Sequence, residues 1–144
     1  MSKLKKKVQV IVFRKAFSGI ELLLLQTNER RGYFWQNITG SVDQGETYEK
    51  AALREFAEET GVESRPEKLI KLDLVFNFKD RWGKQAVEKC FVFILNGRFD
   101  IIIDPDEHSD FRWIPLDQVQ SEDYQYPSNY EAFQLAKNKV LDLI

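Results

Sequence analysis

The sequence has one cysteine, one histidine and no long hydrophobic run, and each shortage excludes a class of protein. Cys90 has no second cysteine with which to form an internal disulfide bond, and Cys90 and His108 alone supply too few ligands for a zinc site. Any metal ion must therefore be held mainly by carboxylates. The longest aliphatic run, residues 22–25, falls far short of the roughly 20 apolar residues that a transmembrane helix needs. The amino-terminal residues also lack the apolar stretch of a secretory signal, so we expect a soluble, cytoplasmic protein.

A surplus of positive charge is also missing. Lys and Arg number 21 and Asp and Glu number 23, which gives a formal net charge of -2. With no general positive field, we expect neither stable nucleic-acid binding nor membrane association. The 144 residues suffice for one hydrophobic core, and no repeat or Pro/Gly/Ser-rich linker interrupts them. We therefore expect a single domain over residues 1–144, with a loose start at residues 1–6. We expect the protein to be a monomer or a homodimer.

The chain does contain a regular succession of strand and helix signals. β-branched and aromatic residues with turn residues between them predict two hairpins, and a last short strand follows. Helical spacing of apolar residues, or an Ala/Glu/Leu-rich composition, predicts two helices. The expected strands are residues 8–13 and 20–26 in one hairpin, 69–78 and 87–95 in the second, and 111–114, and the expected helices are residues 47–60 and 129–143. Such elements favour an α/β (α+β) domain with a mixed sheet and helices on both faces.

The first expected helix carries an acidic face beside its apolar face. Thr47 is a candidate N-cap, and Gly61 is a candidate stop. At about 100° per residue, Glu55, Glu58 and Glu59 gather on one arc, where they repel one another. A solvated charged surface is the ordinary interpretation of such a trio. The alternative is a site for a hard divalent cation such as Mg2+, which prefers oxygen ligands, waters and substrate phosphates.

The loop before this helix adds weak evidence for phosphate binding. Gly40 and Gly45 bracket residues 41–44, and the loop leads directly into the helix N-terminus, where free N–H groups favour anions. Glu46 lies eight residues before Arg54, too far for one helical turn. We expect Glu46 to fold back toward Arg54 as a structural pair.

Together these residues resemble the signature of the Nudix hydrolases. That signature runs Gly, five residues, Glu, seven residues, Arg-Glu, an apolar position, any residue, Glu-Glu, any residue, Gly and an apolar residue, and residues 40–62 match it throughout. The fixed positions are Gly40, Glu46, Arg54, Glu55, Glu58, Glu59 and Gly61, with Phe56 and Val62 at the apolar sites. Fixed residues at fixed spacing make the solvated-surface interpretation far less favoured.

The resemblance implies an α/β/α sandwich with a mixed central sheet that binds Mg2+ or Mn2+ and hydrolyses a diphosphate bonded to another group. It also implies that Glu55, Glu58 and Glu59 hold the metal and take part in catalysis. Many members of the family have a further acidic residue before the last short strand, and by that analogy we favour Glu107 as a metal and catalytic residue. Its alternatives in the same acidic segment are Asp104, Asp106 and Asp110. We expect the neighbouring His108 to be an ordinary loop residue.

The segment before the signature is more selective for substrate. Many Nudix proteins have Pro-Gly-Gly here, whereas residues 34–42 read Phe-Trp-Gln-Asn-Ile-Thr-Gly-Ser-Val and resemble bacterial dihydroneopterin triphosphate pyrophosphatases of folate synthesis. That subgroup releases pyrophosphate and leaves dihydroneopterin monophosphate. It has a basic residue where this chain has Thr27-Asn28, and Arg30 and Arg31 are the candidate replacements. By this resemblance, the expected substrate-binding residues are Trp35, Thr39, Gly40, Ser128 and Asn129.

Three other functions are also compatible with the sequence. A broad pyrophosphohydrolase for nucleoside and deoxynucleoside triphosphates shares the signature. RNA 5'-pyrophosphohydrolases share Trp35-Gln36 but typically continue with Phe-Pro-Gln-Gly-Gly, which this chain lacks. Non-catalytic Nudix sensor modules usually lose a glutamate of the signature, whereas all are present here.

Overall fold

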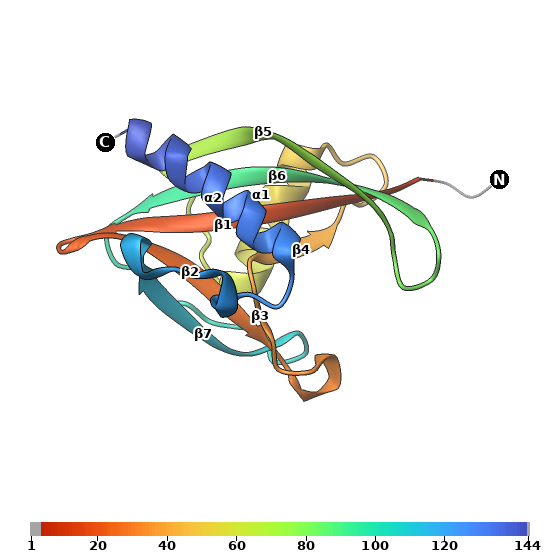
Figure 1. Ribbon diagram of the computed structural model, residues 1–144, viewed down its shortest axis with the longest axis horizontal. Coiled ribbons are helices and arrows are strands. Elements are labelled where there is room, and N and C mark those ends of the chain that lie inside the picture. Colours follow the sequence, from red (N-terminus) through yellow and green to blue (C-terminus); the bar gives the residue numbers. More distant parts are fainter. Residues whose placement is uncertain (1–3, 144) are drawn as a thin grey trace.

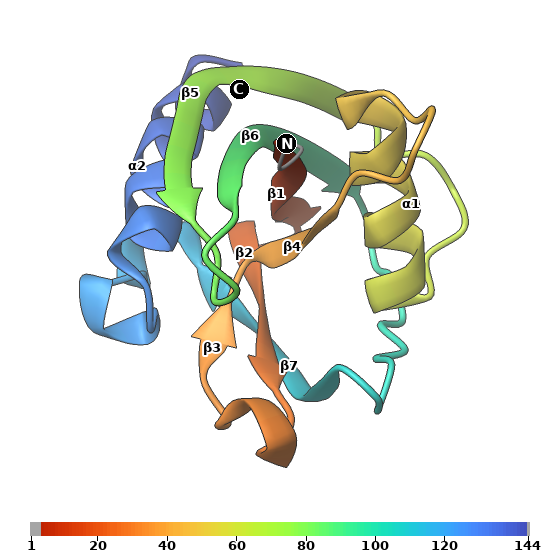
Figure 2. The same cartoon turned by 90° about the vertical axis from the view of Figure 1, so that its right-hand side faces the viewer.

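A seven-stranded mixed sheet runs through the molecule, with α1 on one face and α2 on the other (Figures 1 and 2). The computed structural model describes residues 4–143. The main path of the sheet is β3-β2-β1-β6-β5, and β4 pairs with β1 while β7 pairs with β2. The elements are β1 (Lys5–Ala16), β2 (Gly19–Thr27), β3 (Trp35–Gln36), β4 (Ile38–Ser41), α1 (Tyr48–Thr60), β5 (Lys68–Lys79), β6 (Gln85–Asn96), β7 (His108–Pro115) and α2 (Pro127–Asp142), with short 3-10 helices at η1 (Glu29–Arg31), η2 (Leu116–Gln118) and η3 (Ser121–Asp123).

Both expected hairpins are confirmed as antiparallel pairs, β1 with β2 and β5 with β6. The two hairpins are joined by a long parallel pairing of β1 with β6. The loop expected before α1 is partly strand, because Gly40 and Ser41 end β4, which pairs with β1. The expectation of a loose start over residues 1–6 is wrong at Lys5 and Lys6, which pair with β6, and residues 1–3 lie outside the described part.

Strand alternation divides the apolar residues into two cores. Val8, Val10 and Val12 of β1 face α1, together with Phe91 and Phe93 of β6. The intervening residues of the same strands face α2 and include Ile11, Phe13, Cys90, Val92 and Ile94. The sheet is therefore covered on both faces, which confirms the α/β/α sandwich. Within residues 4–143, neither α-helix combines the length and apolar content that a bilayer crossing requires.

Helix α1 begins and ends as its sequence predicts. The Thr47 side chain accepts a hydrogen bond from the backbone N–H of Lys50, and Gly61 ends the helix with a φ of 72°. Phe56 is buried and packs edge-on against Phe93 of β6 at a ring-centroid distance of 5.3 Å. This packing fixes the rotation of α1 and so directs its acidic arc toward β4 and the start of β7.

Candidate functional site

Arg54 connects α1 to the end of β4. Its Nε and Nη2 donate to the Glu46 carboxylate at 2.9 and 3.0 Å, and Nη2 also donates to the Ser41 carbonyl at 2.8 Å. The expected pairing of Glu46 with Arg54 is therefore confirmed. On its other side, Nη1 lies 3.0 Å from a carboxylate oxygen of Glu55 and 3.3 Å from one of Glu58. One guanidinium thus offsets the repulsion between two glutamates of the acidic arc.

Glu55 is enclosed between α1 and β4. Its side chain is 12% exposed, and a Cβ added at Gly40 would overlap its Cδ and Oε1 atoms. Glycine at position 40 is therefore what leaves room for this carboxyl group. Burial raises the pKa of Glu55 to about 7, although the hydrogen bond and charge of Arg54 oppose the shift.

The raised pKa of Glu55 predicts how stability without metal depends on pH. Between the ordinary value of 4.5 and about 7, the folded protein binds the Glu55 proton more tightly than the unfolded chain does. The free energy of unfolding should therefore fall as pH rises through this window. In a metal chelator, Glu55→Gln should be more stable than the wild type at pH 8, by on the order of 1–2 kcal/mol, and equally stable near pH 4. Urea unfolding at both pH values measures this, and Glu58→Gln, which changes a half-exposed carboxylate, is the matched control with no such difference expected.

Glu59 faces the start of β7 rather than Arg54. Its Oε2 lies 2.6 Å from Nδ1 of His108, and both side chains are buried. The two atoms form no hydrogen bond with each other, and neither has another hydrogen-bond partner within residues 4–143. The expectation that His108 is an ordinary loop residue is wrong. It opens β7, where alternation turns its side chain inward.

Glu107 is the neighbour of His108 but points elsewhere. Its carboxylate is about half exposed and lies 3.1 Å from Nη1 of Arg31. Arg30 donates to the carbonyl of Asp106, so η1 is held against the acidic loop. The basic residues expected to contact phosphate are therefore bonded to that loop. Among the described residues, Glu107 forms an ion pair with Arg31 and no metal-holding cluster with the glutamates of α1.

A divalent cation fits the donor atoms of this region. Glu55 is a buried carboxyl group with a raised pKa, and Glu59 has a buried oxygen without a hydrogen-bond partner. Carboxylate oxygens are the ligands that Mg2+ and Mn2+ prefer. Within residues 4–143, no three His, Cys, Asp or Glu side chains are arranged to hold one metal ion. Arg54 pairs with Glu55 and Glu58, and Arg31 pairs with Glu107. The metal and catalytic roles of Glu55, Glu58, Glu59 and Glu107 stay predictions.

The expected substrate-binding residues divide between the two faces of the sheet. Thr39 pairs with Gln9 on the α2 side, and Asn129 of α2 lies nearby, accepting a hydrogen bond from the Asn37 backbone at 2.9 Å. Gly40 lies on the α1 side against Glu55. Two further positions are separate: the Trp35 ring lies 4.4 Å beneath the Arg112 guanidinium, and Ser128 is half-buried in the first turn of α2. Their roles in binding stay predictions.

A buried polar network on the α2 side was not foreseen from the sequence. Tyr124 donates to Asn37, Asn37 donates to Gln9, and Gln9 donates to Glu88, over distances of 2.8, 2.8 and 2.9 Å. The sequence signal was a polar residue among apolar neighbours, Gln9 between Val8 and Val10 in β1 and Glu88 after Val87 in β6. Both fall on the same face, which only the pairing of these strands reveals.

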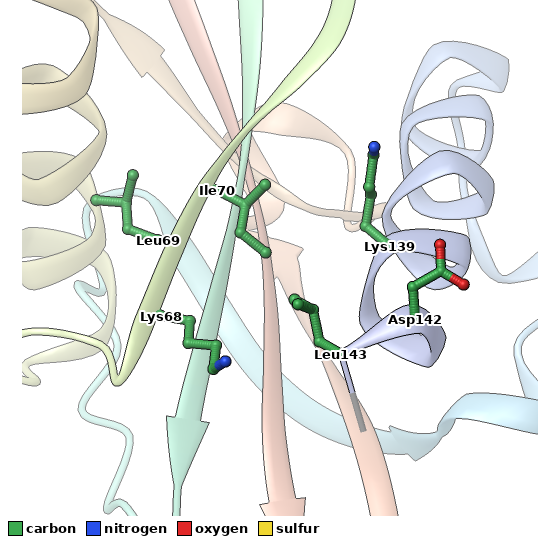
Figure 3. Close-up of a pocket in the computed structure, with 6 residues that line it drawn as sticks. All are labelled: Lys68, Leu69, Ile70, Lys139, Asp142 and Leu143. Atoms are coloured by element: carbon green, nitrogen blue, oxygen red, sulfur yellow. The ribbon is translucent and has the colours of Figure 1, made fainter.

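Two open pockets border the α2 side of the sheet. One, of about 470 Å³, lies between the start of β5 and the end of α2 (Figure 3). Its lining is Lys68, Leu69, Ile70, Lys139, Asp142 and Leu143. Since a single carboxylate lines it and it contains none of the signature residues, it does not resemble a metal-dependent site. The other pocket, of about 560 Å³, lies at the opposite end of β5 and is lined by Leu4, Lys5, Asp80, Trp82 and Lys84.

Comparison with known proteins agrees with this geometry. A model of the NUDIX domain matches residues 3–136. Dihydroneopterin triphosphate diphosphatase of Escherichia coli K12 is 38% identical over 69 residues, which are 48% of this chain and 45% of that protein. The chain is thus aligned with about half the length of that relative. An RNA pyrophosphohydrolase of Novosphingobium aromaticivorans is 32% identical over 135 residues, 81% of each chain.

Solved structures give the same result for the fold. The structure of the E. coli dihydroneopterin triphosphate pyrophosphohydrolase superposes with a TM-score of 0.75 at 25% identity. The superposition covers 92% of this chain and 95% of that one. The likeness therefore extends far beyond the signature helix.

Proposed function

Because the chain belongs to the Nudix family, we propose that it is a metal-dependent pyrophosphohydrolase that cleaves a triphosphate to a monophosphate and pyrophosphate. The observation that carries this proposal is the complete signature over residues 40–62, with Glu55 buried against Gly40 and Glu59 turned inward on the same helix. A non-catalytic module would have no need to keep a buried carboxyl group whose pKa is raised.

Glu55, Glu58 and Glu59 are the residues that would hold Mg2+ or Mn2+. The ion, when bound, would offset phosphate charge and lower the pKa of a bound water. Arg54 keeps α1 fixed on β4 through Glu46 and the Ser41 carbonyl. His108 lies against Glu59 on the other side, with its Nδ1 2.6 Å from Oε2 of Glu59. These contacts would position the carboxylates before substrate arrives, which reduces the cost of ordering them.

The substrate that we propose is dihydroneopterin triphosphate. Support comes from the segment 34–42 and from the E. coli relative whose name carries that activity. The net charge of -2 also suits a small-molecule substrate better than a long polyanion.

A panel assay with Mg2+ tests this proposal. We expect dihydroneopterin triphosphate to be cleaved with a higher kcat/KM than ATP, GTP or dGTP, and pyrophosphate to be the product. A preference for a nucleoside triphosphate, or release of orthophosphate, would replace the pterin with a nucleotide substrate. If no triphosphate is cleaved, the sensor module becomes the better interpretation.

One second candidate has a specific observation in its favour. The RNA pyrophosphohydrolase of N. aromaticivorans aligns with 81% of this chain. Adding 5'-triphosphorylated RNA to the panel separates this activity from the small-molecule one.

Glu107 is proposed to act on the phosphates from the loop opposite α1. Glu107→Gln should lower turnover, while the melting temperature stays nearly unchanged, because a half-exposed carboxylate contributes little to packing. For this role, Glu107 would have to leave Arg31. Because this ion pair is exposed, Arg31→Gln should preserve folding as well. If Asp104→Asn or Asp106→Asn lowers turnover and Glu107→Gln does not, the loop is correctly chosen and the residue is wrong.

A further inference from the structure

Glu88 is a buried acidic residue that the proposed hydrolysis does not use. It lies on the α2 side of β6, and its side chain faces away from α1 and the signature glutamates. Glu88 as a whole is 6% exposed. Lys7 of β1 and Phe76 of β5 pair with Glu88 from either side, so their side chains flank it on the same face. A buried carboxylate is costly unless it is satisfied, so its partners need to be identified.

The network around Glu88 directs its donors toward the carboxylate. Tyr124 donates to Asn37, Asn37 donates through its amide to Gln9, and Gln9 donates to Oε1 of Glu88 at 2.9 Å. The oxygen of each amide accepts from the preceding donor, so the NH2 group of that amide points to the next acceptor. Within residues 4–143, Gln9 is the one hydrogen-bond donor to the Glu88 carboxylate, and Oε2 has none. Glu88 is therefore the last acceptor in this series of hydrogen bonds, and its carboxylate can accept further ones.

Lys7 places a donor beside this acceptor. It pairs directly with Glu88, yet the two charged groups do not come within ion-pair distance in the described structure. Burial lowers the pKa of Lys7, and the charge of Glu88 opposes that shift. Burial likewise raises the pKa of Glu88, and the hydrogen bond from Gln9 and the charge of Lys7 oppose that shift. An ammonium and a carboxylate held side by side offer one donor next to one or two acceptors.

We propose that Lys7 and Glu88 read the substrate's heterocycle, and that they select a ring edge with a carbonyl, a ring N–H and an amino group in that order. Lys7 donates to the carbonyl, while Glu88 accepts from the N–H and the amino group. This 2-amino-4-oxo edge is shared by pterin and guanine. Adenine presents an amino group and an unprotonated nitrogen instead, which would leave both Lys7 and Glu88 facing the wrong partner.

The neighbourhood suits a flat ring with a triphosphate tail. Phe76 and Phe78, both half-buried on β5, give the same face an apolar wall. An open pocket lined by Lys5 and Trp82 lies two residues from Lys7 along β1, at the same end of the sheet. Lys7 also pairs with Ser41, the residue after Gly40. β4 thus lies between the Lys7 side chain on the α2 side and Glu55 on the α1 side, and the proposed substrate would extend around β4 from one to the other.

The experiment compares Glu88→Gln and Lys7→Met with the matched controls Glu131→Gln and Lys71→Met, which change exposed residues. The kcat/KM is measured for dihydroneopterin triphosphate, GTP and ATP. We expect both 2-amino-4-oxo substrates to lose at least about 10-fold in Glu88→Gln and in Lys7→Met, while ATP changes by less than about 2-fold. The controls should match the wild type. An equal loss for all three substrates, or an unchanged preference, overturns the proposal.

This inference rests on the proposed function, and a binding measurement separates the two. Neopterin, guanosine and adenosine carry no phosphate, so calorimetry reports ring recognition without hydrolysis. If no triphosphate is cleaved but neopterin and guanosine bind the wild type more tightly than Glu88→Gln, the hydrolase proposal fails and this one stands. If the rings bind both proteins equally, this one fails. Should Glu88→Gln not fold, Lys7→Met, which changes a half-buried side chain, decides the outcome in both assays.

Discussion

With Mg2+ present, Glu59→Gln and Glu55→Gln are each expected to lower kcat at least about 100-fold. Each substitution keeps the shape of the side chain and removes the charge that would hold a metal ion or activate water. Glu59 has a buried oxygen that no hydrogen bond satisfies, and Glu55 is enclosed against β4. Both variants should fold, since loss of a like charge from the acidic arc relieves repulsion by a few tenths of a kcal/mol.

Steady-state rates over a range of Mg2+ concentrations, with circular dichroism as the check on folding, measure this effect. Glu49→Gln is the matched control, because Glu49 is an exposed glutamate in the first turn of α1. It should retain wild-type activity. Unchanged rates in both Glu55→Gln and Glu59→Gln would show that α1 does not form the active site.

The elements that local sequence determines were predicted well. Helix α1 carries its own cap at Thr47 and its own stop at Gly61, and its apolar arc is complete within one segment. Both hairpins have short turns between strands of matching composition, so their pairing depends on neighbouring residues. In these cases, nothing distant in the chain was needed to decide the structure.

The features that depend on distant pairing were missed. The parallel register of β1 with β6 joins residues about eighty positions apart, and it alone brings Gln9 next to Glu88. The short strands β3 and β4 have too few residues to show a pattern. Which of two adjacent side chains turns inward at the start of β7 depends on its pairing with β2, so His108 rather than Glu107 lies beside Glu59.

Gly40→Ala is expected to lower kcat/KM at least about 100-fold with Mg2+ present, because a displacement of about 1 Å at a catalytic group can cost that much. A Cβ at position 40 would overlap the Glu55 carboxyl group, and Gly40 is held in place by the pairing of β4 with β1. The backbone cannot retreat without breaking that pairing, so the Glu55 side chain must move. Moving it would also weaken the hydrogen bond that Glu55 accepts from Arg54, the residue that connects α1 to the end of β4.

Gly45→Ala is the matched control for this prediction. Gly45 lies in the loop between β4 and α1 with a φ of 81°, and no atom lies within 4 Å of the position that a Cβ would take. Alanine there brings backbone strain of about 1 kcal/mol without any overlap, so stability should fall slightly while kcat/KM stays close to wild type. Combining Gly40→Ala with Glu55→Gln gives a second check: if Gly40 acts through Glu55, the double variant should be no slower than Glu55→Gln alone. Multiplied losses in the double variant would mean that Gly40 acts on the site by a route other than the Glu55 carboxyl group.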